Sequence, residues 1–504
     1  MTQSTSTPKC IFIELLGRYE WLNTAIIKNM RERYGTRFIL LAGGEQVRQL
    51  YLPHCSEQDE IITLQEVEEL CKRTPNPDED NKLALQNEEE FGVNYILDIL
   101  QQDRAIFGTY MPYAASSWTK KKIDDLDTLN AKLNGYFDWS NKLIESKGID
   151  LVALRPGGLM ATVFIHVAMS KKIPVTMSRP SRHKSYMTWT YGAYSGHQIL
   201  EEAYNNHPED GLEVVPLEDI LPPEGSRQVF EQFKRQSSVK LLMRKLLLAV
   251  YNHTVNGYRA LKAGERHRIP SLTAGLKDIV YSWYSMKTLD SMSHEDLDQM
   301  CEKPFVAFLL PKEPEYTVQS LARNFSNVQA MVQQVALSLP AGYNLVVKEH
   351  SRVGYRRMAF YTDLLKLPNV ILCNAKVPGS VLMNRASAVT TVAGTAAIEA
   401  TLLGKKAVIF AADVEYNFLP SIKTIRSFDE LAPALREAVR EESSEGVEKI
   451  RLSGARYLAA VADSSYDAPN TKVFEGNVPI SPEQTAKSVD LLVHSFQMQL
   501  NHRT

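Results

Sequence analysis

The sequence predicts an α/β protein whose C-terminal half contains a parallel β-sheet covered by helices on both faces. Between residues 345 and 412, helical segments alternate with four short apolar runs rich in Val and Ile: LVVK, NVILC, AVTTVA and AVIFAA. Such runs, separated by helices, are typical of a parallel sheet buried on both faces. In addition, Gly394 and Thr395 lie between a strand and a helix, where backbone N–H groups and the helix dipole favour an anion.

The N-terminal half is predicted to begin as a βαβ unit of the same kind. Residues 9–16 and 36–42 have the apolar character of strands, and a helical pattern at 21–34 separates them. Further strands are expected at 149–155 and 173–177. The two halves together therefore predict two doubly wound domains.

Helical stretches are predicted as insertions in the N-terminal half. The polar, proline-rich residues 74–82 predict a loop, after which helical patterns dominate from 88 to 147. A second helical stretch runs from 228 to 290. We interpret both stretches as helical additions to a Rossmann-like domain.

Composition narrows the class of protein. A chain of 504 residues can form two or three domains with separate cores. The formal net charge of −2 gives no overall field that would hold nucleic acid, so we expect no nucleic-acid partner. The five cysteines are scattered, with no CxxC pair, which predicts reduced thiols in a cytosol rather than disulfides or a zinc site.

The N-terminus and one basic segment bear on location. Residues 1–9 contain no apolar core of a signal peptide, and no apolar run approaches the ~20 residues that span a bilayer. We expect a cytoplasmic protein, or one bound peripherally at the inner membrane. Residues 228–268 carry nine Lys or Arg against two Glu, a balance of +7, around the apolar helix at 240–250. An anionic membrane surface is one predicted partner of this segment. A core helix with a solvated face is the alternative.

Residues 304–416 resemble a known family. They contain, in order, a Pro-Glu loop, the sequence FSNVQ, the sequence LPAG, the sequence VKEH and a Gly-Thr turn. This order resembles the capsule polysaccharide biosynthesis proteins, which are GT-B glycosyltransferases similar to Kdo transferases. The family usually has Pro after the His of VKEH; here Ser351 stands there and leaves the loop less rigid.

The resemblance implies a GT-B fold, in which two Rossmann-like domains face a cleft. Residues 1–295 are expected to form an N-terminal acceptor domain with the helical segments. Residues 296–480 are expected to form the nucleotide-sugar-binding domain, and 481–504 a helix that crosses back to the first domain.

Donor-binding candidates follow the predicted strands of the C-terminal half, because such sheets bind ligands at the carboxyl ends of their strands. The predicted phosphate site combines the N–H groups of a Gly-Thr turn with a basic loop. Further loops are placed to contact the base, the ribose or the sugar, although ordinary turns and solvated side chains are the alternative. The candidates are Glu313, Lys348, His350, Pro378, Gly379, Ser380, Gly394, Thr395, Ala396, Glu399, Glu415 and Tyr416.

Acceptor and catalytic candidates come from the N-terminal half. Asp103 and His183 are the predicted general bases, since either side chain can take a proton from an acceptor hydroxyl. Four arginines are candidates for binding a phosphate or an acidic sugar: Arg104, Arg155, Arg179 and Arg182. Helix-end salt bridges and a solvated basic loop are the alternatives.

No metal or cofactor is expected. The acidic triplets at 78–80, 125–127 and 296–298 have the spacing of metal-dependent transferases, but none follows a predicted strand. We therefore interpret them as unrelated to metal binding.

The resemblance implies transfer of a sugar from a nucleotide donor, CMP-Kdo-like or a UDP- or GDP-sugar, to a surface or capsular glycan. Two alternatives remain open. One is an isomerase related to UDP-sugar 2-epimerases, although their Gly-Gly-x-Gln-Glu-Glu turn is replaced here by the sequence AGTAA at 393–397. The other is a non-catalytic component of polysaccharide assembly.

Overall fold

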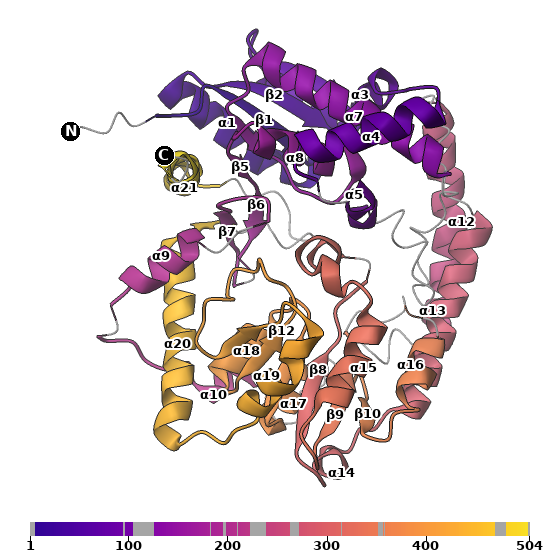
Figure 1. Ribbon diagram of the computed structural model, residues 1–504, viewed down its shortest axis with the longest axis vertical. Helices are drawn as coiled ribbons and strands as arrows, with labels where there is room; N and C mark the ends of the chain where they lie inside the picture. The colour runs from indigo at the N-terminus through magenta and orange to yellow at the C-terminus, as the bar shows by residue number, and fades with distance from the viewer. Residues whose placement is uncertain are drawn as a thin grey trace.

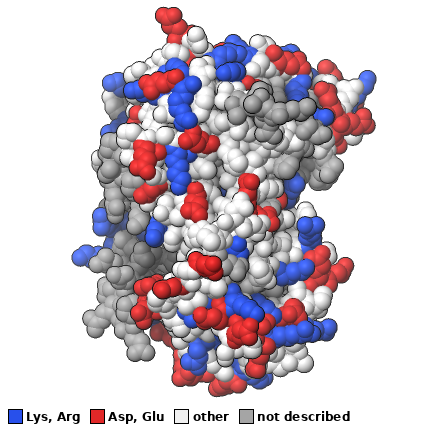
Figure 2. Space-filling model, turned by 90° about the vertical axis from the view of Figure 1, so that its left-hand side faces the viewer, with Lys and Arg blue, Asp and Glu red and all other residues white. Residues whose placement is uncertain are grey.

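Two parallel β-sheets, one from each half of the chain, form the framework of the protein (Figure 1). The fold was obtained as a computed structural model. The structure describes residues 6–93, 96–103, 125–181, 183–194, 198–208, 210–221, 238–262, 272–313, 315–350, 356, 358–468 and 480–501. Figure 2 shows the surface indented between the two halves.

The N-terminal sheet has the strand order β3-β2-β1-β4-β5, and all its neighbours are parallel. Its central strand β1, with the sequence CIFIEL, is buried over nearly its whole length because helices cover both faces. Helices α1 and α21 pack on one face, and α7 and α8 on the other. The strands are β1 Cys10–Leu15, β2 Arg37–Ala42, β3 Glu60–Thr63, β4 Leu151–Ala153 and β5 Val175–Thr176.

The C-terminal sheet has the order β10-β9-β8-β11-β12-β13 and is also entirely parallel. Numbered from its own first strand, this order is 3-2-1-4-5-6, the arrangement of a doubly wound fold. The strands are β8 Phe305–Leu309, β9 Asn344–Lys348, β10 Val370–Cys373, β11 Ala388–Thr391, β12 Ala407–Ile409 and β13 Ile422–Thr424. The predicted α/β fold with two Rossmann-like domains is confirmed.

Helices connect the strands in both halves. The N-terminal half contains α1 Glu20–Tyr34, α2 Glu45–Tyr51, α3 Leu64–Leu70, α4 Pro77–Glu90, α5 Ile96–Gln102, α7 Leu126–Lys147, α8 Leu159–Ser170, α9 Gln198–Asn206 and α10 Leu217–Ile220. Two long helices follow, α12 Val239–Lys262 and α13 Leu272–Met292. The C-terminal half contains α14 Leu297–Met300, α15 Val328–Ser338, α16 Met358–Leu364, α17 Gly379–Arg385, α18 Ala396–Leu402, α19 Leu431–Ala438, α20 Ser444–Asp463 and α21 Pro482–Asn501.

One predicted loop is a helix. Residues 74–82 were expected to be irregular, but α4 begins at Pro77. A proline at the start of a helix costs nothing, because its missing N–H would have no partner in the helix. Asp78, Glu79 and Asp80 occupy the first turn, where carboxylates complement the helix dipole. The polar composition therefore marks a helix start.

The chain passes between the two sheets more than once. The last helix, α21, contributes Val489, Leu492 and Phe496 to the core of the N-terminal sheet. Conversely, α9 packs against α20, and Tyr204 joins the core of the C-terminal sheet. A small antiparallel sheet, β14-β7-β6, lies between the two halves; its strands are β6 Ser178–Pro180, β7 Tyr186–Trp189 and β14 Tyr466–Asp467. The domain ranges given above stay a prediction.

Helices α12 and α13 pack against each other as a hairpin, and α12 lies outermost, at the right of Figure 1. Helix α13 connects this hairpin to the C-terminal half, since its residue Leu289 joins that core and α13 contacts α16.

The close crossing of α7 over the end of α3 generates a prediction. A Cβ atom added at Gly135 would lie 2.0 Å from the carbonyl oxygen of Cys71. This oxygen belongs to the backbone, which cannot easily move away. We expect Gly135→Ala to lower the free energy of unfolding by roughly 1–3 kcal/mol through overpacking. The matched control is Gly275→Ala in α13, where an added Cβ meets nothing within 4 Å. That change should be neutral or stabilising, since Ala favours helix more than Gly. Equal urea midpoints for both variants would contradict the role of Gly135.

Candidate functional site

The carboxyl ends of strands from both sheets meet at one junction. Arg179 in β6, just after the N-terminal sheet ends, lies with Nη2 2.7 Å from Oε1 of Glu415, which follows β12. The side chains are 9% and 4% exposed, so the ion pair is shielded from water. The two residues were predicted on opposite sides of the site, and the structure places them in contact.

Tyr316 lies at the same junction, after β8. Its hydroxyl donates a hydrogen bond of 3.2 Å to the carbonyl oxygen of Ala193, which belongs to the N-terminal half. Burial raises the pKa of the Tyr316 hydroxyl, and the charges of Arg179, Glu415, Arg155 and Asp413 act on it to a smaller extent. These four charged residues, two from each half, therefore surround one buried phenol.

Several buried polar atoms at this junction have no hydrogen-bond partner among the described residues. They include Nε and Nη2 of Arg179 and Oε2 of Glu415, although Nη2 lies close to Oε1 of Glu415 in the ion pair. Both amide atoms of the fully buried Gln319 are also unpartnered. Gln319 lies in a short π-helix, Thr317–Leu321, and π-helical turns are frequent at functional sites. Native proteins rarely leave such atoms unsatisfied, which favours a ligand-binding role.

The Gly-Thr turn after β11 is held in place by a side chain from the loop after β12. The Tyr416 hydroxyl donates a 2.8 Å hydrogen bond to the carbonyl oxygen of Gly394. A Cβ at Gly394 would lie 2.8 Å from Oγ1 of Thr391, so a side chain there would displace the turn. The Thr395 hydroxyl donates to Glu399, whose pKa is raised by burial. Ala396 begins α18, and the N–H groups of Gly394 and Thr395 make no hydrogen bond within the described residues.

A buried ionic network fixes the loops after β8 and β9. The Arg356 guanidinium lies between two carboxylates, contacting Glu349 and, at 2.8 Å, Glu313. The Tyr361 hydroxyl donates a 2.5 Å hydrogen bond to Glu349. Burial raises the pKa of Glu313 to about 7, while Arg356 opposes this shift. One guanidinium cannot fully compensate two buried carboxylates, so Glu313 holds its proton more tightly.

The other donor-side candidates line the same sheet edge. Lys348, at the end of β9, is buried and its ammonium donates to the carbonyl oxygen of Ala375, with a pKa lowered by burial. The N–H of His350 donates to Glu349, and its side chain is half-buried. Pro378, Gly379 and Ser380 form the half-buried start of α17.

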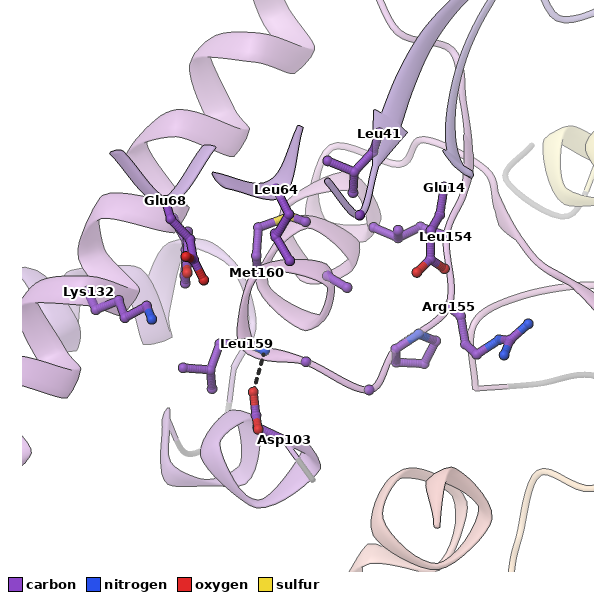
Figure 3. A pocket seen from close by; sticks show the side chains of 16 residues that line it. Glu14, Leu41, Leu64, Glu68, Asp103, Lys132, Leu154, Arg155, Leu159 and Met160 are labelled. Atoms are coloured by element: carbon purple, nitrogen blue, oxygen red, sulfur yellow. Dashed lines mark hydrogen bonds between the residues drawn. The ribbon is translucent and has the colours of Figure 1, made fainter. Parts of the chain in front are cut away.

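A cavity of about 400 Å³ lies at the carboxyl edge of the N-terminal sheet (Figure 3). It opens where β1 and β4 lie side by side, the point where the strand order reverses and such sheets bind ligands. Glu14 and Arg155 lie at one end, and Glu68 and Lys132 at the other. The cavity thus offers both charge signs to a polar ligand.

The two predicted bases lie in different places. Asp103 lines this cavity, and its carboxylate accepts a 3.3 Å hydrogen bond from the N–H of Leu159 at the start of α8. His183 lies in the turn between β6 and β7, where burial, with a contribution from Lys184, lowers its pKa. Arg104 and Arg182 lie outside the described residues.

Sequence reasoning missed several site residues. Glu14 carried a usable signal, because it is the one carboxylate in an otherwise apolar strand and lies near that strand's carboxyl end. Arg356, Tyr361 and Gln319 carried none, because their spacing does not reveal that they converge with the strand ends. Tyr316, next to the predicted Pro-Glu loop, could have been inferred from that loop alone.

The acidic triplets prove to be helix starts. Asp125 and Asp296 cap α7 and α14, each accepting a hydrogen bond from the first turn, and Asp80 lies in the first turn of α4. Among the residues that the structure describes, no group of three or more acidic, His or Cys side chains is arranged to hold a metal ion. Within the same residues, no helix is both long and apolar enough to cross a bilayer.

Sequence comparison bears on the C-terminal half. Residues 218–418 match the profile of the family described as capsule polysaccharide biosynthesis protein. The predicted resemblance is confirmed. The matched segment includes α12, α13 and the C-terminal sheet from β8 to β12. No curated protein sequence matches the chain.

Solved structures are similar at low identity. The beta Kdo 2,4 transferase KpsC of Thermosulfurimonas dismutans is 12% identical over 61% of this chain and 79% of its own, with a TM-score of 0.28. The calicheamicin glycosyltransferase CalG4 is 11% identical over 98% and 99%, with a TM-score of 0.27. The UDP-GlcNAc 2-epimerase of Methanocaldococcus jannaschii, solved with UDP-GlcNAc and UDP, is 10% identical over 88% and 97%, with a TM-score of 0.24. The fold assignment rests on the strand order of the two sheets.

The buried network predicts a pH dependence of stability. Because the pKa of Glu313 rises from an ordinary 4.5 to about 7, the folded protein keeps a proton that the unfolded chain loses. The free energy of unfolding should therefore fall between these pH values, on the order of 3 kcal/mol for this group. Glu313→Gln cannot titrate and should flatten the fall, measured as urea midpoints across this range. The control, Glu445→Gln, changes a carboxyl that is 78% exposed and should keep the wild-type slope. A wild-type slope in Glu313→Gln would refute the assignment.

Proposed function

We propose that this protein is a glycosyltransferase of the GT-B type that moves a sugar from a nucleotide donor to a surface or capsular glycan. The observation that carries the proposal is the meeting of both carboxyl edges at Arg179 and Glu415. A transferase must hold donor and acceptor across one junction, and this arrangement brings polar groups of both domains together there. The family match of residues 218–418 supports the same reaction class.

The donor is assigned to the C-terminal edge. The N–H groups of Gly394 and Thr395 would hold its phosphate, with the dipole of α18 adding to the stabilisation. His350 would contact a phosphate or ribose oxygen, and Glu399 a ribose hydroxyl. Pro378, Gly379 and Ser380 would frame the base. This arrangement does not distinguish among CMP, UDP and GDP sugars.

The acceptor is assigned to the cavity of the N-terminal sheet. Transfer forms a bond from an acceptor hydroxyl oxygen to the anomeric carbon, whose bond to the donor phosphate breaks. The phosphate leaves with the electron pair, and Arg179 would stabilise its negative charge. The hydroxyl proton passes to Asp103 or His183; a lowered pKa keeps His183 neutral and able to accept it near pH 7. The proposal places the enzyme in the cytoplasm, where nucleotide sugars are made.

A thermal-shift screen with CMP, UDP, GDP and their sugars tests the donor site, because a ligand that binds the folded state raises its apparent stability. We expect one nucleotide series to raise the Tm. His350→Ala should weaken that binding by about 1.5–3 kcal/mol, typical of a charge-assisted hydrogen bond, as measured by calorimetry. The control His54→Ala changes an exposed histidine of the N-terminal half and should bind as wild type does.

The binding measurements, together with an assay for turnover of the nucleotide sugar without acceptor, separate the alternatives. Binding of no nucleotide would point to a non-catalytic assembly component. Conversion of the nucleotide sugar to an epimer without acceptor would point to an isomerase. Unchanged affinity in a folded His350→Ala variant would remove this histidine from the donor site.

Transfer should need no divalent metal. Two of the acidic triplets supply helix caps and the third lies in the first turn of α4, while Arg179 and a helix terminus would stabilise the leaving phosphate. We expect full transfer rates with excess EDTA, measured on metal-stripped protein with the donor found in the screen. Activity that disappears with EDTA and returns with Mg²⁺ or Mn²⁺ would overturn this prediction.

A further inference from the structure

The outward side of α12 exposes a row of large apolar side chains. Met243, Leu247, Tyr251, Tyr258 and Leu261 are 53%, 68%, 61%, 69% and 50% exposed. We call these five residues the outer stripe. Isolated exposed apolar residues are common, but several large ones on one side of a single helix are typical of a surface that binds something.

The outer stripe follows the helical repeat. At about 100° per residue, its five members fall within an arc of roughly 80° on the helix surface. Leu242, Leu246, Ala249 and His253 lie on another side of the helix and are all partly buried. Helix α12 thus has one side toward the protein and a separate apolar side toward solvent.

The charge of α12 has a single sign. The helix contains Lys240, Arg244, Lys245, Arg259 and Lys262 and no Asp or Glu. All five cations are exposed, and Lys240, Arg244 and Lys262 lie beside or within the arc of the outer stripe. By contrast, the face in Figure 2 has Lys and Arg interspersed with Asp and Glu. An apolar row flanked by cations alone complements a surface that is apolar inside and anionic outside.

We propose that the outer stripe and its flanking cations dock this protein on an anionic membrane surface. The leucines and Met243 would enter the boundary between headgroups and acyl chains, while Lys and Arg contact lipid phosphates. Tyr251 and Tyr258 suit this depth, because their rings are apolar and their hydroxyls polar. The structure thereby adds to the sequence-based expectation a defined face and a defined orientation of the helix.

A second copy of the chain fits the same face less well. In a two-fold pairing, the same side of α12 would meet itself, and the two helices would bring ten cations together with no carboxylate from either. Like charges in such contact destabilise association. An anionic bilayer supplies the missing negative charge.

The proposal deepens the proposed function, since a membrane is where a lipid-linked glycan acceptor would be met. Its test does not depend on catalysis. Binding to sedimented vesicles needs neither donor nor acceptor, so a failure of vesicle binding leaves the transfer reaction untouched, and a failure of transfer leaves the docking face untouched.

The experiment compares vesicles of pure phosphatidylcholine with equimolar phosphatidylcholine and phosphatidylglycerol at low salt. We expect the wild-type chain to sediment only with the anionic vesicles and to be released by high salt. The triple variant Lys240→Glu, Arg244→Glu and Lys262→Glu should bind about 100-fold more weakly, because each cation near an anionic leaflet contributes roughly fivefold. Leu247→Gln with Tyr258→Gln should weaken binding while keeping the salt dependence.

The control reverses three cations elsewhere: Lys28→Glu, Lys142→Glu and Lys449→Glu. These side chains are 74%, 73% and 73% exposed on α1, α7 and α20, so the net charge changes equally. The control should bind the vesicles as wild type does. Wild-type protein that ignores anionic vesicles, or equal loss in both triple variants, would overturn the proposal. A dimer in light scattering that Leu247→Gln with Tyr258→Gln dissociates would assign the face to a second copy and overturn it as well.

Discussion

The site depends on one constraint of parallel sheets: the loops that follow the strands all lie at the carboxyl edge of the sheet. In this protein the constraint operates twice, and the Arg179–Glu415 ion pair joins the two edges. A charged pair this well buried costs desolvation that the attraction between its partners repays only in part. Buried atoms of both side chains have no hydrogen-bond partner, so the ion pair contributes little to the stability of the fold. The same atoms are available to bind a polar ligand between the two domains.

The loops at the carboxyl edge of the C-terminal sheet are held by interactions that are largely buried. Arg356 ties the loops after β8 and β9 together, and Tyr416 supports the Gly-Thr turn after β11. Tyr416 holds the turn through the carbonyl oxygen of Gly394 and therefore does not use the N–H groups of the turn. A rigid edge that still exposes N–H groups is what binding a phosphate requires.

The strands and most helices could be predicted from the sequence, because they follow periodic patterns of apolar residues. Contacts between residues far apart in the sequence could not. The strands around 345–412 could be placed because apolar runs and helical patterns alternate there over a long stretch. The start of α4 was mistaken for a loop, because Pro and three acidic residues describe both a turn and a first helical turn. Lys348 and Glu415 could be named as candidates because each lies at or just after the end of a predicted strand. That Glu415 faces Arg179, more than 200 residues away, depends on how two domains are oriented, and no local pattern encodes this.

The placement of α21 has a consequence for how the chain matures. One face of the N-terminal sheet is covered partly by Val489, Leu492 and Phe496, which are synthesised after the strands of both sheets. While the ribosome is still extending the chain, the strands from β1 to β5 can pair, but this face stays uncovered until α21 emerges. The first domain therefore completes its core only after the second sheet has been translated, and the nascent protein depends on α21 to bury surface made several hundred residues earlier.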